Sequence, residues 1–275
     1  MKHLRILRII LAILFLVASV AALIWGSDVH PAAAVAERSQ ILPSALSVTA
    51  GAALVWLVIT FLFGRFYCST VCPVGTLSDL SLRLRRLLSR RSPLKFAYRH
   101  PSRIGKHVLW IYLACVVIGV VGVPFLIEPW NIMRNAAATV RPDAVHSTWT
   151  MLGVSAIAGM VGGLVALALI VVSSLIWGRR FCTDICPLGT MMGYVSNYSL
   201  YHIEIDRDCC SSCGICEQVC RASCIKVVSR YVDNARCIRC LDCLTACPDG
   251  AIHLQINRNR PATPLMMRKK ANKPT

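Results

Sequence analysis

Charged residues are scarce in this chain of 275 residues, and acidic residues are the scarcest of them. Only 16% of the residues are charged, 13 are Asp or Glu, and 56% are hydrophobic, which is not the composition of a soluble protein. The 30 Lys and Arg residues give a net charge of +17, which in a soluble domain would suggest binding to nucleic acid. The position of these charges along the chain must therefore decide between a nucleic-acid partner and a membrane.

Histidine is also rare, and none lies in the long apolar stretches. A membrane cytochrome needs histidines that face each other within the bilayer, so no haem is expected. Kinase, DNA-binding and catalytic nucleotide motifs are lacking too. Cysteine, in contrast, is abundant: its 15 residues are odd in number and closely spaced, which favours metal or cluster ligation over a disulfide framework.

Four apolar stretches are long enough to cross a bilayer core of about 30 Å, which takes about 20 helical residues. They are residues 9–25, 46–63, 108–127 and 151–177. The first follows a basic N-terminus and could instead be a cleaved signal peptide, but the topology would be the same.

Positive charge marks the cytoplasmic side of the predicted helices. The net charges are +3, +9, +1 and +6 for the N-terminus and residues 64–106, 178–184 and 258–275, but −1 and 0 for loops 26–45 and 128–150. Topology thus explains the basic residues, and a nucleic-acid partner is not expected. We expect a lipid-embedded protein of the bacterial inner membrane with both termini in the cytoplasm and loop 128–150 on the other side.

The segment that follows the second apolar stretch is basic and amphipathic. Its leucines share one helical face: Leu77, Leu80, Leu84, Leu87 and Leu88. This pattern predicts a helix that lies in the lipid headgroup layer. Binding of anionic lipid by its arginines is a less specific alternative.

Two cysteine runs of the form C-x2-C-x2-C-x3-C lie 27 residues apart. Three thiolates at this spacing can hold one iron-sulfur cube, while the fourth completes the neighbouring cube. This rule predicts two [4Fe-4S] clusters, one on Cys210, Cys213, Cys216 and Cys247, the other on Cys237, Cys240, Cys243 and Cys220. Zinc is the competing interpretation, but zinc ribbons use pairs of cysteines and not interlocking quartets.

This segment resembles the bacterial two-cluster ferredoxins. Short β-prone stretches at 202–206, 225–228 and 251–256 predict the small strands that flank such loops. Arg221 stands where that family usually has the proline that Pro248 supplies in the second run. The replacement leaves ligation intact, and its effect on the packing of the first loop stays open.

A second repeat closes the second and fourth apolar stretches. Gly64-Arg-Phe-Tyr-Cys68-Ser-Thr-Val-Cys72-Pro73 matches Gly178-Arg-Arg-Phe-Cys182-Thr-Asp-Ile-Cys186-Pro187 at an offset of 114 residues. The match predicts two pseudo-symmetric helical hairpins whose four thiols meet, with Arg65 and Arg179 near enough to offset thiolate charge. These cysteines predict a further cluster or metal site, with a purely structural role as the alternative.

With the doubled G-R-x2-C-x3-C-P motif and the two ferredoxin runs, the chain resembles the NapH/MauN group of ferredoxin-type membrane proteins. Its motifs are also similar to those of NosR-like and CcoG-like proteins. The resemblance implies a non-catalytic subunit that passes electrons between the quinol pool and a partner redox enzyme. It implies membrane-proximal redox or metal-binding thiols at Cys68, Cys72, Cys182 and Cys186. A maturation factor for another metalloenzyme and a thiol redox sensor are the alternatives.

The predicted fold is thus an α-helical membrane protein with four transmembrane helices, in two pseudo-symmetric hairpins, plus a small α+β two-cluster ferredoxin-like domain. The predicted domains are residues 1–200, residues 201–257 and a basic, disordered tail at 258–275. Gly159 and Gly163, after Ser155, predict close helix packing. A quinol site beside Glu128, Arg134 and Asn135, or at the opposite face, stays open.

Three cysteines remain outside the motifs. Cys115 lies in the third apolar stretch and is most simply a small apolar residue. Cys209 and Cys224 flank the first cluster loop and are read as spare thiols, with alternative ligands as the second interpretation.

Overall fold

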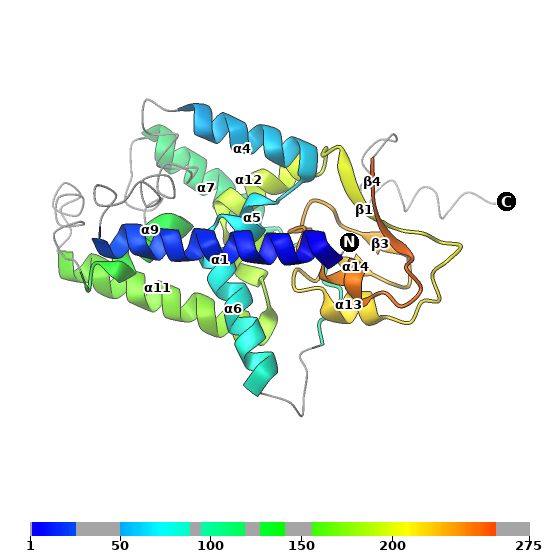
Figure 1. The fold of residues 1–275 in the computed structure, drawn as a ribbon. Helices are drawn as coiled ribbons and strands as arrows, with labels where there is room; N and C mark the ends of the chain where they lie inside the picture. Colours follow the sequence, from blue (N-terminus) through cyan, green and yellow to red (C-terminus); the bar gives the residue numbers. More distant parts are fainter. Residues whose placement is uncertain (1, 26–49, 89–94, 119–126, 141–155, 257–275) are drawn as a thin grey trace.

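The computed structural model describes residues 2–25, 50–88, 95–118, 127–140 and 156–256. A helical domain lies on the left of Figure 1, and a small cysteine-rich domain (residues 201–256) lies on the right. The predicted basic tail lies outside the described residues, as do the whole loop 26–45 and the adjoining ends of the second, third and fourth apolar stretches.

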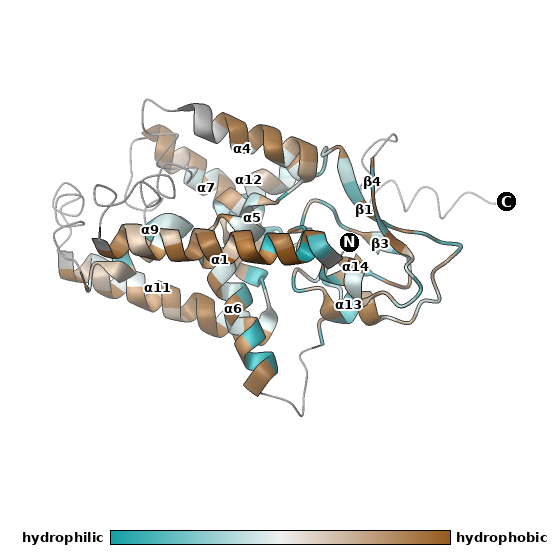
Figure 2. Cartoon of the chain, viewed as in Figure 1, coloured by the Kyte–Doolittle hydropathy of each residue, from teal (hydrophilic) through white to brown (hydrophobic). Residues whose placement is uncertain are grey.

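Long apolar helices make up most of the helical domain. They are α1 (Lys2–Trp25), α4 (Ala50–Phe63), α7 (Ile104–Ile118) and α11 (Ala156–Trp177). Two of them, over His3–Ile24 and Ile157–Trp177, are long and apolar enough to cross a membrane; the described apolar parts of α4 and α7 are shorter. Only 22% of each of these two apolar segments is buried, so most of their apolar side chains are exposed. Figure 2 shows how hydrophobic both helices are along their length. A core helix of a soluble protein would bury that surface.

Helix α1 begins at Lys2, well before the predicted start at Ile9. Its basic first turns are held by carboxylates: Arg5 Nε lies 2.9 Å from Asp242 Oδ1, and Arg8 Nη2 lies 3.4 Å from Asp79 Oδ2. Because these pairs compensate the charge, the helix continues past its apolar part toward the cysteine-rich domain.

Each copy of the membrane-face motif folds in the same way. Gly64 and Gly178 end α4 and α11 with φ of +78° and +73°, a conformation that L side chains rarely adopt. A short turn of helix follows, and the proline of each Cys-Pro pair then begins the next helix, where its missing N–H is not needed. These elements are α5 (Tyr67–Thr70), the π-helical turn η1 (Phe181–Ile185), α6 (Pro73–Leu88) and α12 (Pro187–Ser196).

Helix α6 is the predicted amphipathic helix, and it runs across α1 and α11 in Figure 1. Most of the predicted leucine face points outward, with Leu84 54% and Leu87 76% exposed, but Leu77 packs against the helical core. The opposite face, with Leu82 and the carboxylate of Asp79, is buried against α1 and α11. An apolar face that is left exposed beside basic residues suits a headgroup layer.

Helix α9 (Pro129–Ala137) corrects the predicted position of residues 128–138. They were expected to begin a translocated loop, but Glu128, Asn131 and Asn135 are buried, and α9 packs against α11, α6 and α1. The Glu128 side chain caps α9 by accepting from the backbone N of Asn131 at 2.9 Å. Hydropathy could not reveal this helix, because its inward face is partly polar.

The close approach of α9 to α11 is made at Gly163. A Cβ at this position would lie 2.5 Å from the Cβ of Asn135 and 2.8 Å from the backbone N of Ala136. The predicted close packing at Gly163 is therefore confirmed, with α9 as the partner helix.

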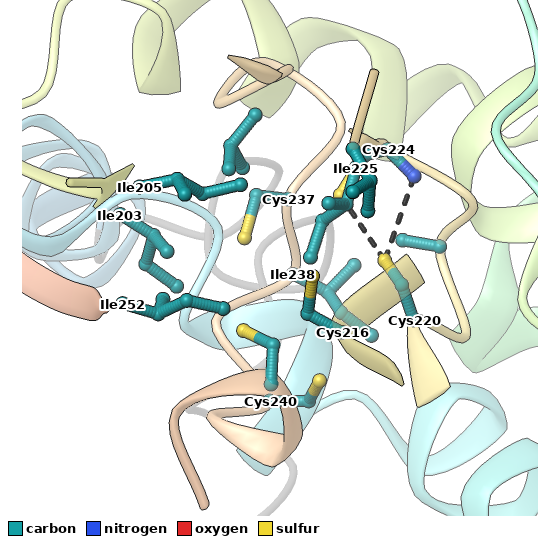
Figure 3. Packing of buried hydrophobic residues seen from close by; sticks show 14 residues of the cluster. Ile203, Ile205, Cys216, Cys220, Cys224, Ile225, Cys237, Ile238, Cys240 and Ile252 are labelled. Atoms are coloured by element: carbon teal, nitrogen blue, oxygen red, sulfur yellow. Dashed lines mark hydrogen bonds between the residues drawn. The ribbon is translucent and has the colours of Figure 1, made fainter. Parts of the chain in front are cut away.

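The cysteine-rich domain contains two small antiparallel sheets. The first pairs β1 (Tyr201–Ile205) with β4 (Ile252–Ile256), and the second pairs β2 (Ile225–Lys226) with β3 (Tyr231–Val232). Helices α13 (Ile215–Val219) and α14 (Asp242–Ala246) follow the two cysteine loops and pack against each other. All three predicted strand regions are confirmed, and β3 was missed because only two residues pair. Cysteines and isoleucines together form the core (Figure 3).

Gly163→Ala should lower the stability of the helical domain by about 1–3 kcal/mol, because the new methyl group would overlap α9. Gly162→Ala is the matched control: nothing lies within 4 Å of its Cβ, so helix propensity alone should act and leave stability equal or slightly higher. Thermal unfolding of both variants in detergent measures the difference. Equal unfolding temperatures would contradict the close packing.

Candidate functional site

The first predicted cysteine quartet meets at the surface of the cysteine-rich domain. Cys210 and Cys213 lie on the loop into α13, Cys216 lies in its first turn, and Cys247 follows α14. Burial raises the pKa of Cys216 to about 11, and the nearby thiols of the other three also raise it. Cys213 is exposed, while Cys210 and Cys247 are half-buried. We call these four residues the outer quartet.

The second predicted quartet lines one small cavity in the domain core. Its members, called the inner quartet, are Cys220, Cys237, Cys240 and Cys243. All four are buried among isoleucines (Figure 3). Burial raises the pKa of Cys240 to about 12, so an uncompensated thiolate is unfavourable there. Cys220 is the fourth cysteine of the first run, whereas the other three belong to the second run. This is the exchange of fourth cysteines that the sequence predicted.

The loops of the two quartets share an unusual backbone. Ser212 and Gly214 have φ of +57° and +79°, and their equivalents 27 residues later, Arg239 and Leu241, have +54° and +62°. Left-handed residues between the cysteines turn successive backbone N–H groups toward one centre. Such concavities stabilise anionic groups, including iron-sulfur clusters with their thiolates.

The three remaining cysteines differ in environment. Cys224 lines the same cavity as the inner quartet, and its Sγ lies 3.4 Å from that of Cys220. The sequence signal for this position was that Cys224 follows Cys220 by four residues. Cys209 is exposed, and the carboxylates of Asp206 and its neighbours raise its pKa. Cys115 lies half-buried on α7, in accordance with a simple apolar role.

The membrane-face cysteines form a third group, called the four-thiol site: Cys68, Cys72, Cys182 and Cys186. All four are at most 6% exposed. Burial raises the pKa of Cys72, and the thiols of Cys182, Cys68 and Cys186 raise it further, so the four share one environment. Cys186 also caps α12 by accepting from the backbone N of Gly189 at 3.4 Å. The 114-residue repeat thus brings these thiols together.

Zinc and iron-sulfur cubes place different demands on the three cysteine groups. In the described part of the chain, no three His, Cys, Asp or Glu side chains lie close enough to bind a single metal ion. Zinc gathers its ligands around one ion, whereas a cube distributes four thiolates over four irons and holds them further apart. The four thiols of each group are the donor set of an iron-sulfur cube.

Two arginines connect the copies of the membrane-face motif reciprocally. Arg65 Nη2 donates to the carbonyl oxygen of Cys182 at 2.6 Å, and Arg179 Nη1 donates to that of Cys68 at 2.5 Å. Burial raises the pKa of the Cys182 thiol, and the two guanidiniums offset part of that rise. Both arginines thus lie beside the four-thiol site, as the sequence predicted.

Asp79 is the centre of a buried ion-pair network. Its Oδ1 lies 2.9 Å from Arg179 Nε and from Arg221 Nη1, and its Oδ2 lies 3.4 Å from Arg8 Nη2. Burial alone would raise the pKa of Asp79, but the three guanidiniums outweigh it and hold the pKa well below its usual range. The network therefore keeps a buried carboxylate ionised.

Arg221 carries this network into the cysteine-rich domain. Its Nη2 lies 2.7 Å from Asp242 Oδ2 at the start of α14, so one side chain bridges α6 and α14. This explains why the residue after Cys220 is an arginine and not the usual proline. Sequence reasoning missed Asp79 and Asp242 as site residues; the available signal was that Asp79 is the single acid among residues 64–106.

Comparisons with known proteins agree with this site. A family described as a 4Fe-4S binding domain matches residues 46–92 and 158–200, which contain the four-thiol site, and a second family of the same description matches residues 230–253. The chain is 25% identical over 214 residues to the ferredoxin-type protein NapH of Escherichia coli, covering 73% of this chain and 66% of that protein. The chain is a relative of the NapH and MauN ferredoxin-type proteins.

The methylamine utilization ferredoxin-type protein MauN of Paracoccus denitrificans is 27% identical over 179 residues, or 65% of this chain and 56% of MauN. An uncharacterized protein of Methanocaldococcus jannaschii is 28% identical over 200 residues, or 72% of this chain and 68% of its own length. The chain thus spans about half to two thirds of the length of these relatives. No solved structure matches it. Together, the two matching family descriptions and the many cysteines support iron-sulfur clusters in this chain.

Asp79→Asn should destabilise the protein by about 3–5 kcal/mol, because Arg179 and Arg221 would keep buried charges without a counter-charge. Since the folded-state pKa of Asp79 is depressed, its contribution is present above the ordinary aspartate pKa of about 4 and is lost as the pH falls below it. Denaturant unfolding from pH 7 to pH 3 should show a constant gap between wild type and variant that narrows below about pH 4. The exposed Asp208→Asn is the control, and an equal effect there would contradict the network.

Proposed function

We propose that this chain is a membrane-bound iron-sulfur electron-transfer protein that connects the quinol pool with a partner redox enzyme. The observation that carries the proposal is the presence of three cysteine groups in series in one chain: the four-thiol site, the inner quartet and the outer quartet. Cubes held by the two quartets would supply one-electron carriers. The four-thiol site would hold a further cluster or metal.

Contacts between the domains support the order of these groups. Arg221 follows Cys220 of the inner quartet and pairs with Asp79, whose other partner, Arg179, donates to the carbonyl of Cys68 in the four-thiol site. This chain of contacts joins the inner quartet to the four-thiol site. The inner quartet is therefore the one adjacent to the helical domain.

The outer quartet is the group that a partner protein can approach. Cys213 is exposed, and the neighbouring Ile215 is 39% exposed, whereas every cysteine of the inner quartet is buried. Electron transfer between proteins requires a short separation, so partial exposure at one end of the series suits a docking site. The enclosed inner quartet and four-thiol site keep water away from the rest of the route.

The donor sets fit iron-sulfur clusters on chemical grounds. The inner quartet and the four-thiol site each offer four buried thiols, where free thiolates would be costly. Cluster iron would neutralise that charge, and Arg65 and Arg179 offset part of what remains at the four-thiol site. Both left-handed cysteine loops add backbone N–H groups.

We further propose that α4 and α7, with adjoining residues of the predicted stretches 46–63 and 108–127, cross the inner membrane together with α1 and α11. Both termini and the cysteine-rich domain would then be cytoplasmic. The basic helix α6 and the basic first turns of α1 support this orientation, because positive charge marks the cytoplasmic side. All three thiol groups would lie on the reducing side, where thiols persist.

Anaerobically purified protein should contain about eight irons and eight acid-labile sulfides from the two quartets, because each cube has four of each. A cluster in the four-thiol site would add to this count. Cys240→Ser should remove the electron paramagnetic resonance signal of the inner quartet's cluster and leave the other, while Cys115→Ser should keep all the iron. Stoichiometric zinc with little iron would sink the proposal.

Serine at Cys68, Cys72, Cys182 or Cys186 should stop reduction of the ferredoxin clusters by a quinol analogue, since electrons would lose their point of entry. Reduction by dithionite, which reaches the outer quartet directly, should be unchanged. Cys209→Ser serves as the control for an unrelated thiol. If all four variants accept electrons from quinol at the wild-type rate, the membrane-face cysteines are structural.

A further inference from the structure

The two halves of the four-thiol site differ in how they neutralise their arginines. Arg179 is paired with the carboxylate of Asp79, at 2.9 Å from Nε and 2.8 Å from Nη2. The 114-residue repeat that relates Arg65 to Arg179 also relates Asp79 to position 193, which is glycine. Arg65 therefore lacks the carboxylate partner that its equivalent has.

Arg65 is nevertheless buried. It is 1% exposed, and its guanidinium donates to two backbone carbonyls, those of Cys182 at 2.6 Å and Ala235 at 3.3 Å. Its Nε is buried without a hydrogen-bond partner, and no carboxylate pairs with it among the described residues. A buried charge in this condition is costly, because carbonyl dipoles replace only part of its hydration.

A cavity of about 370 Å³ opens beside Arg65, where the missing carboxylate would have been. Arg65 and Gly193 both line it, together with Lys106 at the start of α7 and Asn197 after α12. Asp233 also lines it, but its carboxylate is held by Arg236 at 2.8 Å. The cavity is thus positively charged, donor-rich and large enough for a small ligand.

We propose that a phosphate group binds in this cavity as the counter-charge of Arg65, in the role that Asp79 has for Arg179. Arg65 supplies the buried charge, Lys106 a second charge and Asn197 an amide donor, and a planar guanidinium matches phosphate oxygens well. The phosphate can belong to an anionic lipid headgroup, since α7 begins at the cavity, or be free in solution. This inference rests on the charges around Arg65 and not on electron transfer.

Asn197→Asp tests the proposal, because it places a fixed carboxylate in the cavity with almost no change in shape. Isothermal titration of inorganic phosphate into the cluster-loaded full chain in detergent should show saturable binding to wild type. The dissociation constant should rise at least about tenfold in Asn197→Asp and about three- to tenfold in Lys106→Gln. Lys95→Gln removes an equal charge outside the cavity and should leave binding unchanged.

A second measurement distinguishes the two sources of phosphate. Native mass spectrometry after release from nanodiscs should show one retained phosphatidylglycerol, and not phosphatidylcholine, if a lipid headgroup is the ligand; titration with phosphate but no retained lipid indicates the free anion. Either result supports the proposed site only if Asn197→Asp and Lys106→Gln weaken the binding of that ligand. Absence of both ligands from wild type, or wild-type binding in both variants, would overturn the proposed phosphate site.

The iron content and the unfolding temperature of each variant show whether its fold is intact. Lys106 has an exposed side chain, so Lys106→Gln keeps the test valid if Asn197→Asp does not fold.

Discussion

The ionised carboxylate of Asp79 is the interaction on which the arrangement of the two domains depends. Three guanidiniums converge on it from α1, from the second membrane-face motif and from the end of the first ferredoxin run. Removal of a single partner would leave several charges in a medium that solvates them poorly. Buried ion pairs thus hold the helical domain and the cysteine-rich domain together.

This fastening also positions the thiol groups. Arg179 and Arg221 are each within one or three residues of a candidate ligand, Cys182 or Cys220, so a shift of either guanidinium would move a cysteine as well. Pairing them with the same carboxylate ties the four-thiol site to the inner quartet through a few short, directional contacts. Apolar packing alone would permit more sliding between the domains, because dispersion contacts have little directionality.

Spacing along the sequence was enough to predict the strands and to show the membrane-face repeat, because each depends on local pattern or internal repetition. The division of the ferredoxin cysteines into two cluster-binding quartets stays a prediction. Spacing was not enough for the ion-pair network, whose members lie far apart in the chain and meet only after packing. Helix α9 was also missed, since a scan for long apolar stretches has no means to detect a short helix with Asn131 and Asn135 on its inward side. Arg221 looked like a departure from a family pattern and proved to be a bridge between domains.

Helix α9 has a consequence for access to the four-thiol site. Its residues Ile132 and Met133 pack in the same apolar cluster as Cys68 and Cys72, on the side remote from the cysteine-rich domain. They cover the thiols on that side of the helical domain. A cluster held by these thiols would therefore be shielded by α9, and electrons would enter and leave it on the side that faces the cysteine-rich domain.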